Sequence, residues 1–213
     1  METQGLRERK KHRTRRALFE AAVRLFQEKG YEQTTVAEIA AAADVSTKTL
    51  FNYFPAKEDI LFAYRQPRID EALRVIAERG QDEDVISVLI RATGQLFDSL
   101  ADDGADPHDP NRDLVLGRAR VELTLGVPEL RARALQLIFD TQQQLTTALS
   151  KSYPDLDHLT VASVVGALIG AMQAAALVSM ERGDSLEQIQ AMARQAVHVV
   201  LHGARTTLRQ GLA

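Results

Sequence analysis

The stretch TTVAEIAAAADVSTKTLFNYF, residues 34–54, decides the fold of this 213-residue chain. It predicts two short helices, over 36–43 and 47–54, that are joined by a tight turn at residues 44–46. A further helix is expected just before them, over 13–29, because apolar residues recur there at helical spacing. Two short helices that meet at a tight turn are typical of a helix-turn-helix. The sequence therefore predicts a three-helix N-terminal domain that carries this motif.

The ends of these helices are marked by capping residues. Thr35 followed three residues later by Glu38 is the pattern of a capping box. Ser46 can cap the next helix, which Pro55 ends. Lys29 followed by a glycine is the expected end of the first helix. Local side-chain chemistry thus agrees with the helical spacing at each boundary.

The helix over 47–54 has a face suited to DNA. A projection at 100° per residue turns Leu50 and Phe54 toward a small core and leaves Lys48 and Asn52 on the opposite arc. Lysine can donate to guanine, asparagine can pair with adenine, and Phe51 can meet a thymine methyl group. Hydroxyl and ammonium donors on either side, with the amino end of the helix over 36–43, would reach phosphates. The predicted DNA-binding residues are Thr35, Ser46, Thr47, Lys48, Thr49, Phe51, Asn52, Tyr53 and Lys57. The alternative is a solvated polar face on a small helical domain.

The charge of the chain is divided unevenly. Residues 1–57 carry 11 lysines and arginines against 7 acidic residues, whereas residues 58–213 carry 15 against 22. A basic N-terminal part on an acidic body favours a polyanionic partner for that part alone. A solvated basic tail is the simpler alternative.

The pattern stays helical to the end of the chain. A fourth helix is expected from Lys57 to about Glu78, and the others lie near 83–100, 113–123, 128–150, 157–181 and 185–209. An acidic loop over 102–113 interrupts them, and no alternating strand pattern is present. The expected fold class is all-α, with about nine helices.

Residues 13–62 resemble the DNA-binding domain of the TetR family of bacterial transcriptional regulators. The resemblance rests on ALFEAAVRLFQEKGY, TTVAEIAAAADVS and TKTLFNYFPAKEDIL, in that order. It implies a DNA-binding domain over 1–57 and a ligand-binding and dimerisation domain over 58–213. It further implies a homodimeric repressor of a palindromic operator, released by a small-molecule inducer, with Lys57 on a phosphate. Phe51 stands where many members have tyrosine, and Lys48 where a small residue is common, so base preference should differ.

The resemblance also implies that the last two helices form the dimer. Small residues recur at every fourth position in the helix near 157–181, and an apolar stripe runs along the next. The predicted interface residues are Gly166, Gly170, Ala174, Ile189, Ala193 and Val197. The alternative is close packing within one subunit.

An inducer pocket is expected among the middle helices, as in the family. The predicted lining residues are Leu116, Arg118, Arg120, Leu123, Leu137 and Met172. Apolar groups beside arginines suit an amphipathic anion, and TLFNYFPAKEDIL resembles members that sense acyl-CoA-like compounds.

Several other functions are disfavoured. The chain has no cysteine, so disulfides, thiolate metal sites and cysteine nucleophiles are excluded. His198 and His202 lack the glutamate of a zinc protease motif, and residues 109–120 lack the glycine and closing glutamate of a calcium loop. Residues 159–180 carry no charge, but their alanine and glycine content favours a buried helix over a membrane span. No secretion signal is recognised, so a cytoplasmic location is expected. No metal, cofactor or enzymatic activity is expected, and a helical enzyme or scaffold is the alternative to a DNA-binding regulator.

Overall fold

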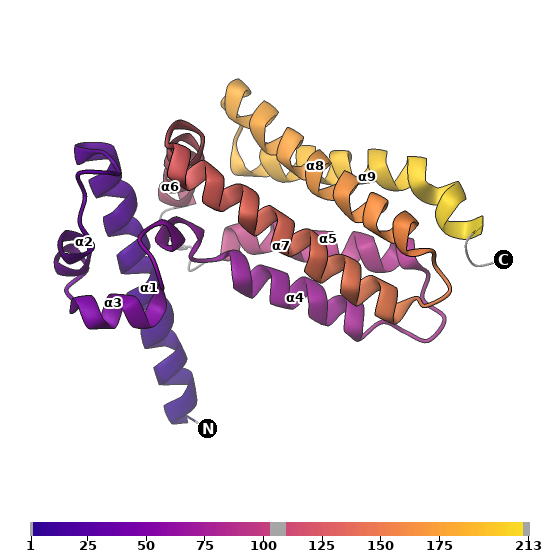
Figure 1. Cartoon of the computed structure of the whole chain (residues 1–213), viewed down its shortest axis with the longest axis horizontal. Coiled ribbons are helices and arrows are strands. Elements are labelled where there is room, and N and C mark those ends of the chain that lie inside the picture. Colours follow the sequence, from indigo (N-terminus) through magenta and orange to yellow (C-terminus); the bar gives the residue numbers. More distant parts are fainter. Residues whose placement is uncertain (1, 103–109, 211–213) are drawn as a thin grey trace. The chain divides into compact units, whose positions relative to one another are not determined.

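The computed structural model describes residues 2–102 and 110–210, without the side chains of residues 2–8, 97–102, 110–114, 186 and 206–210. Within these ranges the chain forms nine α-helices, one short 3₁₀-helix and no strand, which confirms the all-α prediction (Figure 1). The elements are α1 (Glu2–Lys29), α2 (Val36–Ala42), α3 (Thr47–Tyr53), η1 (Glu58–Phe62), α4 (Arg65–Ala77), α5 (Val85–Asp102), α6 (Pro110–Gly126), α7 (Pro128–Ser152), α8 (His158–Arg182) and α9 (Leu186–Gln210).

The chain divides into two compact units. The first holds Met1–Arg65 with Asp103–Leu135, and the second holds Gln66–Asp102 with Gln136–Ala213. The first unit therefore contains α1, α2, α3, η1, α6 and the start of α7, and the second contains α4, α5, α8, α9 and the rest of α7. The domain boundary at residue 57 stays a prediction.

The first unit is built around a core of apolar side chains from every one of its helices. The stripe expected on α1 is buried as the helical spacing predicts. It meets buried residues of α2, α3, η1 and α7, and these core residues include Leu18, Phe26, Ile39, Leu50, Ile60, Leu61 and Leu130. Burial of α3 through Leu50 fixes which side of that helix faces solvent.

Three expected helices differ from the structure by three residues or more. One is α6, which spans Pro110–Gly126 and not 113–123, so residues 110–113 of the expected acidic loop are helical. Helix α1 begins at Glu2 and so includes the basic stretch that precedes residue 13. The continuous helix expected from Lys57 to about Glu78 is instead divided into η1 and α4. Pro67 lies in the first turn of α4, where its missing N–H costs nothing, but inside a longer helix it would remove a hydrogen bond. The proline is a start signal that the apolar pattern alone did not reveal.

The second unit is a bundle in which α8 packs along α9 and α5 packs against α9 (Figure 1). Its core includes Ile76, Val88, Leu149, Val165 and Leu201. By length and composition α8 could cross a membrane, and it is the one such helix among the described residues. Seven of its residues are buried in the unit, whereas its other face is open to solvent. The prediction of a buried helix therefore holds for one face of α8.

Candidate functional site

The turn between α2 and α3 is fixed by hydrogen bonds to the end of α2. The Val45 amide donates to the Ala40 carbonyl at 2.9 Å, and the Asp44 amide donates to the Ala41 carbonyl at 3.1 Å. Asp44 adopts the left-handed conformation, with φ of 54°. This pair of bonds around a left-handed residue is a Schellman motif. The angle at which α3 leaves α2 is therefore set by the backbone.

The predicted capping box at the start of α2 is confirmed. The Thr35 amide donates to Glu38 Oε2 at 2.9 Å, and the Glu38 amide donates to Thr35 Oγ1 at 3.2 Å. Glu38 also accepts from Lys29 Nζ at 2.5 Å. The hydrogen bond from Lys29, with those from Thr35, lowers the pKa of Glu38 to about 2. The carboxylate thus stays charged at the end of α1 and the start of α2.

Helix α3 turns a polar and aromatic face to solvent. Ser46 caps it, accepting from the Thr49 amide at 3.0 Å, while Leu50 and Phe54 are buried beneath it. The exposed residues of the predicted set are Thr35, Ser46, Thr47, Lys48, Phe51 and Asn52, and Thr49, Tyr53 and Lys57 are half-buried. Phe51 leaves half of its surface, 50%, in contact with water. An exposed phenylalanine between a lysine and an asparagine is a face for base edges and methyl groups.

The ammonium of Lys57 forms hydrogen bonds within the first unit. Its Nζ donates to the Tyr31 carbonyl at 2.8 Å and to the Thr34 carbonyl at 3.1 Å, and it lies 4.1 Å from the centroid of the Tyr31 ring. Burial, aided by Glu58, raises the pKa of Tyr31 to about 12, so the ring stays a neutral phenol. Lys57 therefore ties the start of η1 to the loop after α1, and its role on a phosphate stays a prediction.

The basic stretch of α1 divides into two parts. The side chains of Arg9, Lys10, Lys11 and Arg13 are exposed, and that of Arg7 lies outside the described residues. Arg15 instead donates to the Ala63 carbonyl at 2.8 Å and covers the Phe54 ring at 5.5 Å. The charges before residue 14 are thus displayed on a helix. The predicted acidic loop over 102–113 falls largely outside the described residues.

The residues predicted for the dimer face differ in exposure within the subunit, and the interface itself stays a prediction. Ala193 and Val197 are 2% and 4% exposed in the core of the second unit, so they offer no surface to a second copy. A side chain at Gly166 would meet Gln142 of α7 at 3.1 Å, so this glycine faces a helix of its own subunit. Gly170 and Ala174 are exposed, and Ile189 is half-buried.

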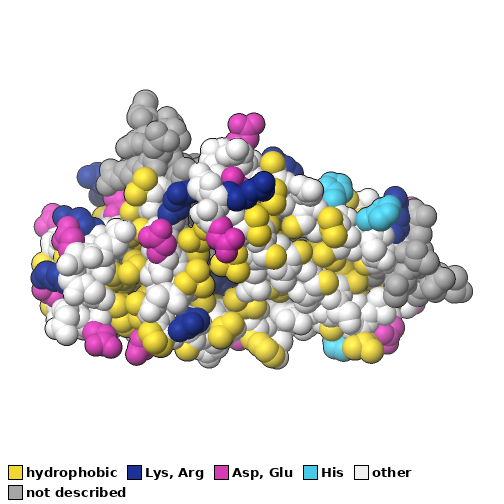
Figure 2. All heavy atoms as spheres, turned by 90° about the horizontal axis from the view of Figure 1, so that it is seen from above, with side chains coloured by type: hydrophobic (Ala, Val, Ile, Leu, Met, Phe, Trp, Pro, Cys, Tyr) yellow, Lys and Arg dark blue, Asp and Glu magenta, His cyan; other side chains and the backbone are white. Residues whose placement is uncertain are grey.

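The free face of α8 is nevertheless apolar. It exposes Leu159, Leu177 and Val178 beside Gly170 and Ala174, and α9 exposes Val199. Figure 2 shows hydrophobic side chains open to solvent on the face seen from above. An apolar stripe of this kind on a helix is a candidate contact surface for another protein chain.

The residues predicted to line an inducer pocket stay a prediction. A small apolar pocket lies in the second unit among α4, α5, α7 and α8. Of the predicted lining residues it contains Met172 alone. Leu116 and Leu123 pack on the core of the first unit, Leu137 is buried on α7, and Arg118 and Arg120 are half-buried on α6. Burial lowers the pKa of the Arg120 guanidinium.

Sequence reasoning missed the pocket residues on α4 and α5. The full lining is Ala72, Ile76, Leu89, Ala92, Thr93, Leu96, Leu145, Leu149, Val165, Leu168, Ile169 and Met172. This lining includes two alanines, Ala72 and Ala92, among larger aliphatic side chains. Small residues on the apolar stripes of α4 and α5 were the signal available in the sequence.

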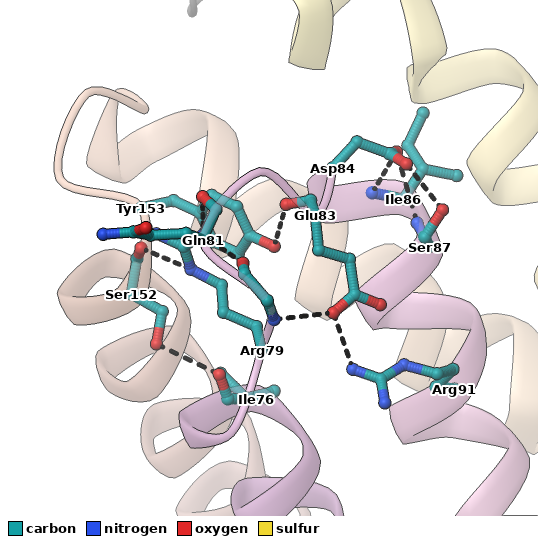
Figure 3. Close-up of polar contacts among 11 residues, drawn as sticks. Ile76, Arg79, Gln81, Glu83, Asp84, Ile86, Ser87, Arg91, Ser152 and Tyr153 are labelled. Carbon is teal, nitrogen blue, oxygen red and sulfur yellow. Dashed lines mark hydrogen bonds and ion pairs between the residues drawn. The ribbon is translucent and has the colours of Figure 1, made fainter.

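A polar cluster closes one end of these helices (Figure 3). Arg79 donates to the carbonyls of Ser152, Gly80 and Gln81 at 2.9–3.0 Å, and it covers the Tyr153 ring at 4.3 Å. The Tyr153 hydroxyl in turn donates to the Glu83 carbonyl at 2.9 Å. The end of α4, the start of α5 and the end of α7 are thus held together.

The other charged groups of this cluster also form hydrogen bonds with residues of the same cluster. The Glu83 carboxylate accepts from Arg91 at 2.8 Å and from the Gly80 amide at 3.0 Å. Asp84 accepts from the Ile86 amide at 3.0 Å and caps the start of α5 (Figure 3).

The two histidines considered for a metal site, His198 and His202, are exposed on α9. No group of three metal-ligating side chains occurs among the described residues.

The chain combines a capped helix-turn-helix with a helical bundle, and this combination places it among the helix-turn-helix proteins. Residues 18–64 match the family described as bacterial regulatory proteins of the TetR family, and residues 107–205 match the MftR C-terminal domain. The chain belongs to the TetR family of bacterial regulatory proteins. Members of this family are DNA-binding transcriptional regulators and not enzymes.

Two characterised relatives are similar over the N-terminal region. The transcriptional regulator TcmR of Streptomyces glaucescens is 48% identical over 56 residues, which are 26% of this chain and 25% of that protein. HbdR of Aromatoleum sp. (strain CIB) is 48% identical over 48 residues, 22% and 21% of the two chains. The similarity thus spans about a quarter of the length of these relatives.

Solved structures share the fold over most of the chain. A complex of SmeT with triclosan has a TM-score of 0.59 at 18% identity and covers 89% of this chain and 90% of SmeT. A TetR-family regulator from Mesorhizobium loti has a TM-score of 0.52 at 17% identity. The match covers 89% of this chain and 96% of the regulator. A second SmeT structure, described as the repressor of the Stenotrophomonas maltophilia multidrug efflux pump SmeDEF, has a TM-score of 0.52 at 19% identity, with 89% of each chain covered.

Proposed function

We propose that the protein is a cytoplasmic homodimeric repressor that binds a palindromic operator and is released from it by a small molecule. Residues 1–57 form the DNA-binding domain in this proposal, and residues 58–213 bind the ligand and form the dimer. The observation that carries it is the face of α3, where Lys48, Phe51 and Asn52 are exposed above a buried Leu50.

The side chains on this face of α3 are suited to sequence-specific contacts with DNA bases. The Lys48 ammonium can donate to O6 and N7 of guanine, and the Asn52 amide can form a pair of hydrogen bonds with adenine. Ser46, which caps α3, and the Schellman turn before it hold the helix in one orientation. The exposed cations from Arg9 to Arg13 would add contacts to phosphates that do not depend on sequence.

A dimer would pair two such faces. The exposed apolar side of α8, around Gly170, Ala174 and Leu177, is the surface that we propose for the contact. A two-fold dimer uses the same patch on both copies, and it presents two recognition helices to half-sites about 34–36 Å apart when these lie one turn apart.

Release by a small molecule needs a ligand that prefers one arrangement of the dimer over another. Helix α7 supports such a link, because Leu130 lies in the core of the first unit whereas Leu145 and Leu149 line the apolar pocket of the second. A ligand that moves α7 at the pocket acts on a helix that is also part of the DNA-binding unit's core. The coupling expected for such a system is about 1–3 kcal/mol. SmeT is described as a repressor in one structure and as a complex with triclosan in another, which is consistent with this mode of action.

The proposal is tested with DNA from upstream of the protein's own gene. Fluorescence anisotropy should show specific binding by the wild type, with Lys48→Ala and Asn52→Ala each weaker by about 1–3 kcal/mol. Lys151→Ala, which removes an exposed lysine of α7, is the matched control and should bind as the wild type does. Unchanged discrimination by Lys48→Ala would show that α3 does not read bases, and an absence of DNA binding would favour a helical scaffold.

A further inference from the structure

We infer that the ion pair between Arg133 of α7 and Asp59 of η1 is a positioning contact for DNA binding. It fixes the direction of α7 against the element that follows α3, and in the dimer it determines which spacing of half-sites the protein accepts. The inference rests on the function proposed above and adds to it the residues that select the spacing.

The pair joins two separate elements of the first unit. Arg133 Nε donates to Asp59 Oδ1 at 2.8 Å, and Arg133 Nη2 lies 2.7 Å from the same oxygen. The side chains of Arg133 and Asp59 are 27% and 13% exposed, so little water competes for the contact. The pair of Arg74 and Glu78, by contrast, is exposed and lies along one helix, where it cannot fix one element against another.

Asp59 lies close to α3 along the chain and is held firmly. Phe54, the C-cap of α3, precedes it by five residues and is buried. Between them, the ammonium of Lys57 donates to two backbone carbonyls of the loop after α1. Ile60, directly after Asp59, is fully buried in the core of the first unit. A displacement of Asp59 is therefore passed to the end of α3 and is not absorbed by a free loop.

Helix α7 enters this contact through its first turns. Leu130 is fully buried in the core of the first unit, and Arg133 follows it by three residues on the same helix. From residue 136 onward α7 belongs to the second unit, where Leu149 is part of the core. Arg133 therefore lies near the point at which α7 passes from one unit to the other.

The two contacts that α7 makes here differ in what they constrain. Burial of Leu130 stabilises the contact without a preferred direction, because the hydrophobic effect depends on the area buried. A guanidinium that approaches a carboxylate with two nitrogens requires a defined geometry. Part of the attraction in such a pair is offset by the hydration that both charges lose. Loss of the pair should therefore loosen the direction of α7 more than it destabilises the first unit.

Direction matters on DNA because half-sites follow a helix. With about 10–10.5 base pairs per turn, one added base pair rotates a half-site by about 35° and moves it by about 3.4 Å. A dimer that holds its two α3 helices firmly should reject this change, whereas a dimer in which they can pivot should accept it. The structure thus connects the ion pair to the selectivity for spacing.

The test compares duplexes that differ by one base pair at the centre. The wild-type chain first selects its inverted-repeat motif from random duplexes, and that motif is then titrated by fluorescence anisotropy with its spacer unchanged, lengthened or shortened. The wild type should prefer the selected spacing by at least ~10-fold, which is the size of one lost base contact. Asp59→Asn and Arg133→Gln should each reduce this preference by at least ~3-fold, and the double variant should lose no more than either single one.

Two further variants separate geometry from charge and from stability. Arg133→Lys keeps the charge but not the planar guanidinium, so it should resemble Arg133→Gln. Arg131→Gln removes an exposed arginine of α7 and is the matched control, with the preference of the wild type. A variant that is only less stable binds all three duplexes more weakly and leaves their ratio unchanged. Asp59→Asn keeps the shape of the side chain and serves as the test if Arg133→Gln does not fold.

The outcomes distinguish this inference from the broader proposal. If the wild type selects no motif, the proposed function fails. If it selects a motif but binds all three spacings equally, or if both single variants keep the spacing preference of the wild type, the positioning role is wrong and the regulator function stands. Losses that add in the double variant would show that Asp59 and Arg133 do not act as a pair, and they would also overturn the inference.

Discussion

Replacement of Lys57 by methionine separates a structural role of this lysine from a role on DNA. Methionine keeps an unbranched side chain but removes the ammonium that donates to the carbonyls of Tyr31 and Thr34. A hydrogen bond from a charged group contributes about 1.5–3 kcal/mol to stability. Because Lys57 is half-buried, water replaces part of each bond in the variant. We therefore expect a loss of about 2 kcal/mol for the two bonds together, with a small addition from the Tyr31 ring.

Native-state hydrogen exchange measures this loss of stability separately for the helices of the first unit. Amides of α1, α2 and α3 should exchange faster in Lys57→Met, whereas amides of α8 should be unaffected because they belong to the other unit. Lys57→Arg restores the charge and should recover part of the protection. Lys151→Met, at an exposed position of α7, controls for loss of a lysine as such.

The salt dependence of DNA binding tests the alternative role of Lys57, a contact between its ammonium and a phosphate. A lysine that neutralises one phosphate contributes about one unit to the slope of log affinity against log salt. Our reasoning predicts that Lys57→Met changes this slope by less than Lys10→Met does. Unchanged exchange in α1–α3 together with a slope lower by about one would refute the structural role, and it would place the ammonium on a phosphate.

Three further predictions concern the turn, the capping box and the dimer. Asp44→Ile, which forces a β-branched residue into the left-handed conformation, should lower the free energy of unfolding by about 1–2 kcal/mol in urea, whereas Asp44→Gly should not. Because the pKa of Glu38 is lowered from 4.5 to about 2, its stabilisation of α2 is complete above pH 4.5 and is lost as the pH falls toward 2. Exchange of the α2 amides should show this loss in the wild type and not in Glu38→Gln. A side chain at Gly170 meets nothing within 4 Å in its own subunit, so Gly170→Leu should keep the fold and dimerise at least ~10-fold more weakly in sedimentation experiments; a tight dimer would move the interface elsewhere.

Features that depend on neighbouring residues along the chain were predictable from the sequence. The capping box of Thr35 and Glu38 and the cap at Ser46 are signals within a few residues, and the structure contains both. The burial of Leu50 follows from helical periodicity in the same way. These local signals define most of the helix-turn-helix before any tertiary contact is known.

Features that depend on packing between distant helices were not predictable. An apolar stripe on α9 shows that Ala193 and Val197 are covered, but the pattern is the same for a core and for a dimer contact. The apolar pocket of the second unit is lined from four helices, so its residues share no sequence window. Lys57 is suited to phosphates by its chemistry, and only the fold reveals that backbone carbonyls already accept from it.

Selection from a random duplex library tests the central claim most directly, because it does not require knowledge of the operator. The wild-type chain should enrich one motif with inverted symmetry, whose half-sites match two copies of the exposed face of α3. The double variant Lys48→Ala, Asn52→Ala should lose that enrichment while it still retains DNA without regard to sequence at low salt. Enrichment of the same motif by the double variant, or no enriched motif with the wild type, would contradict the account.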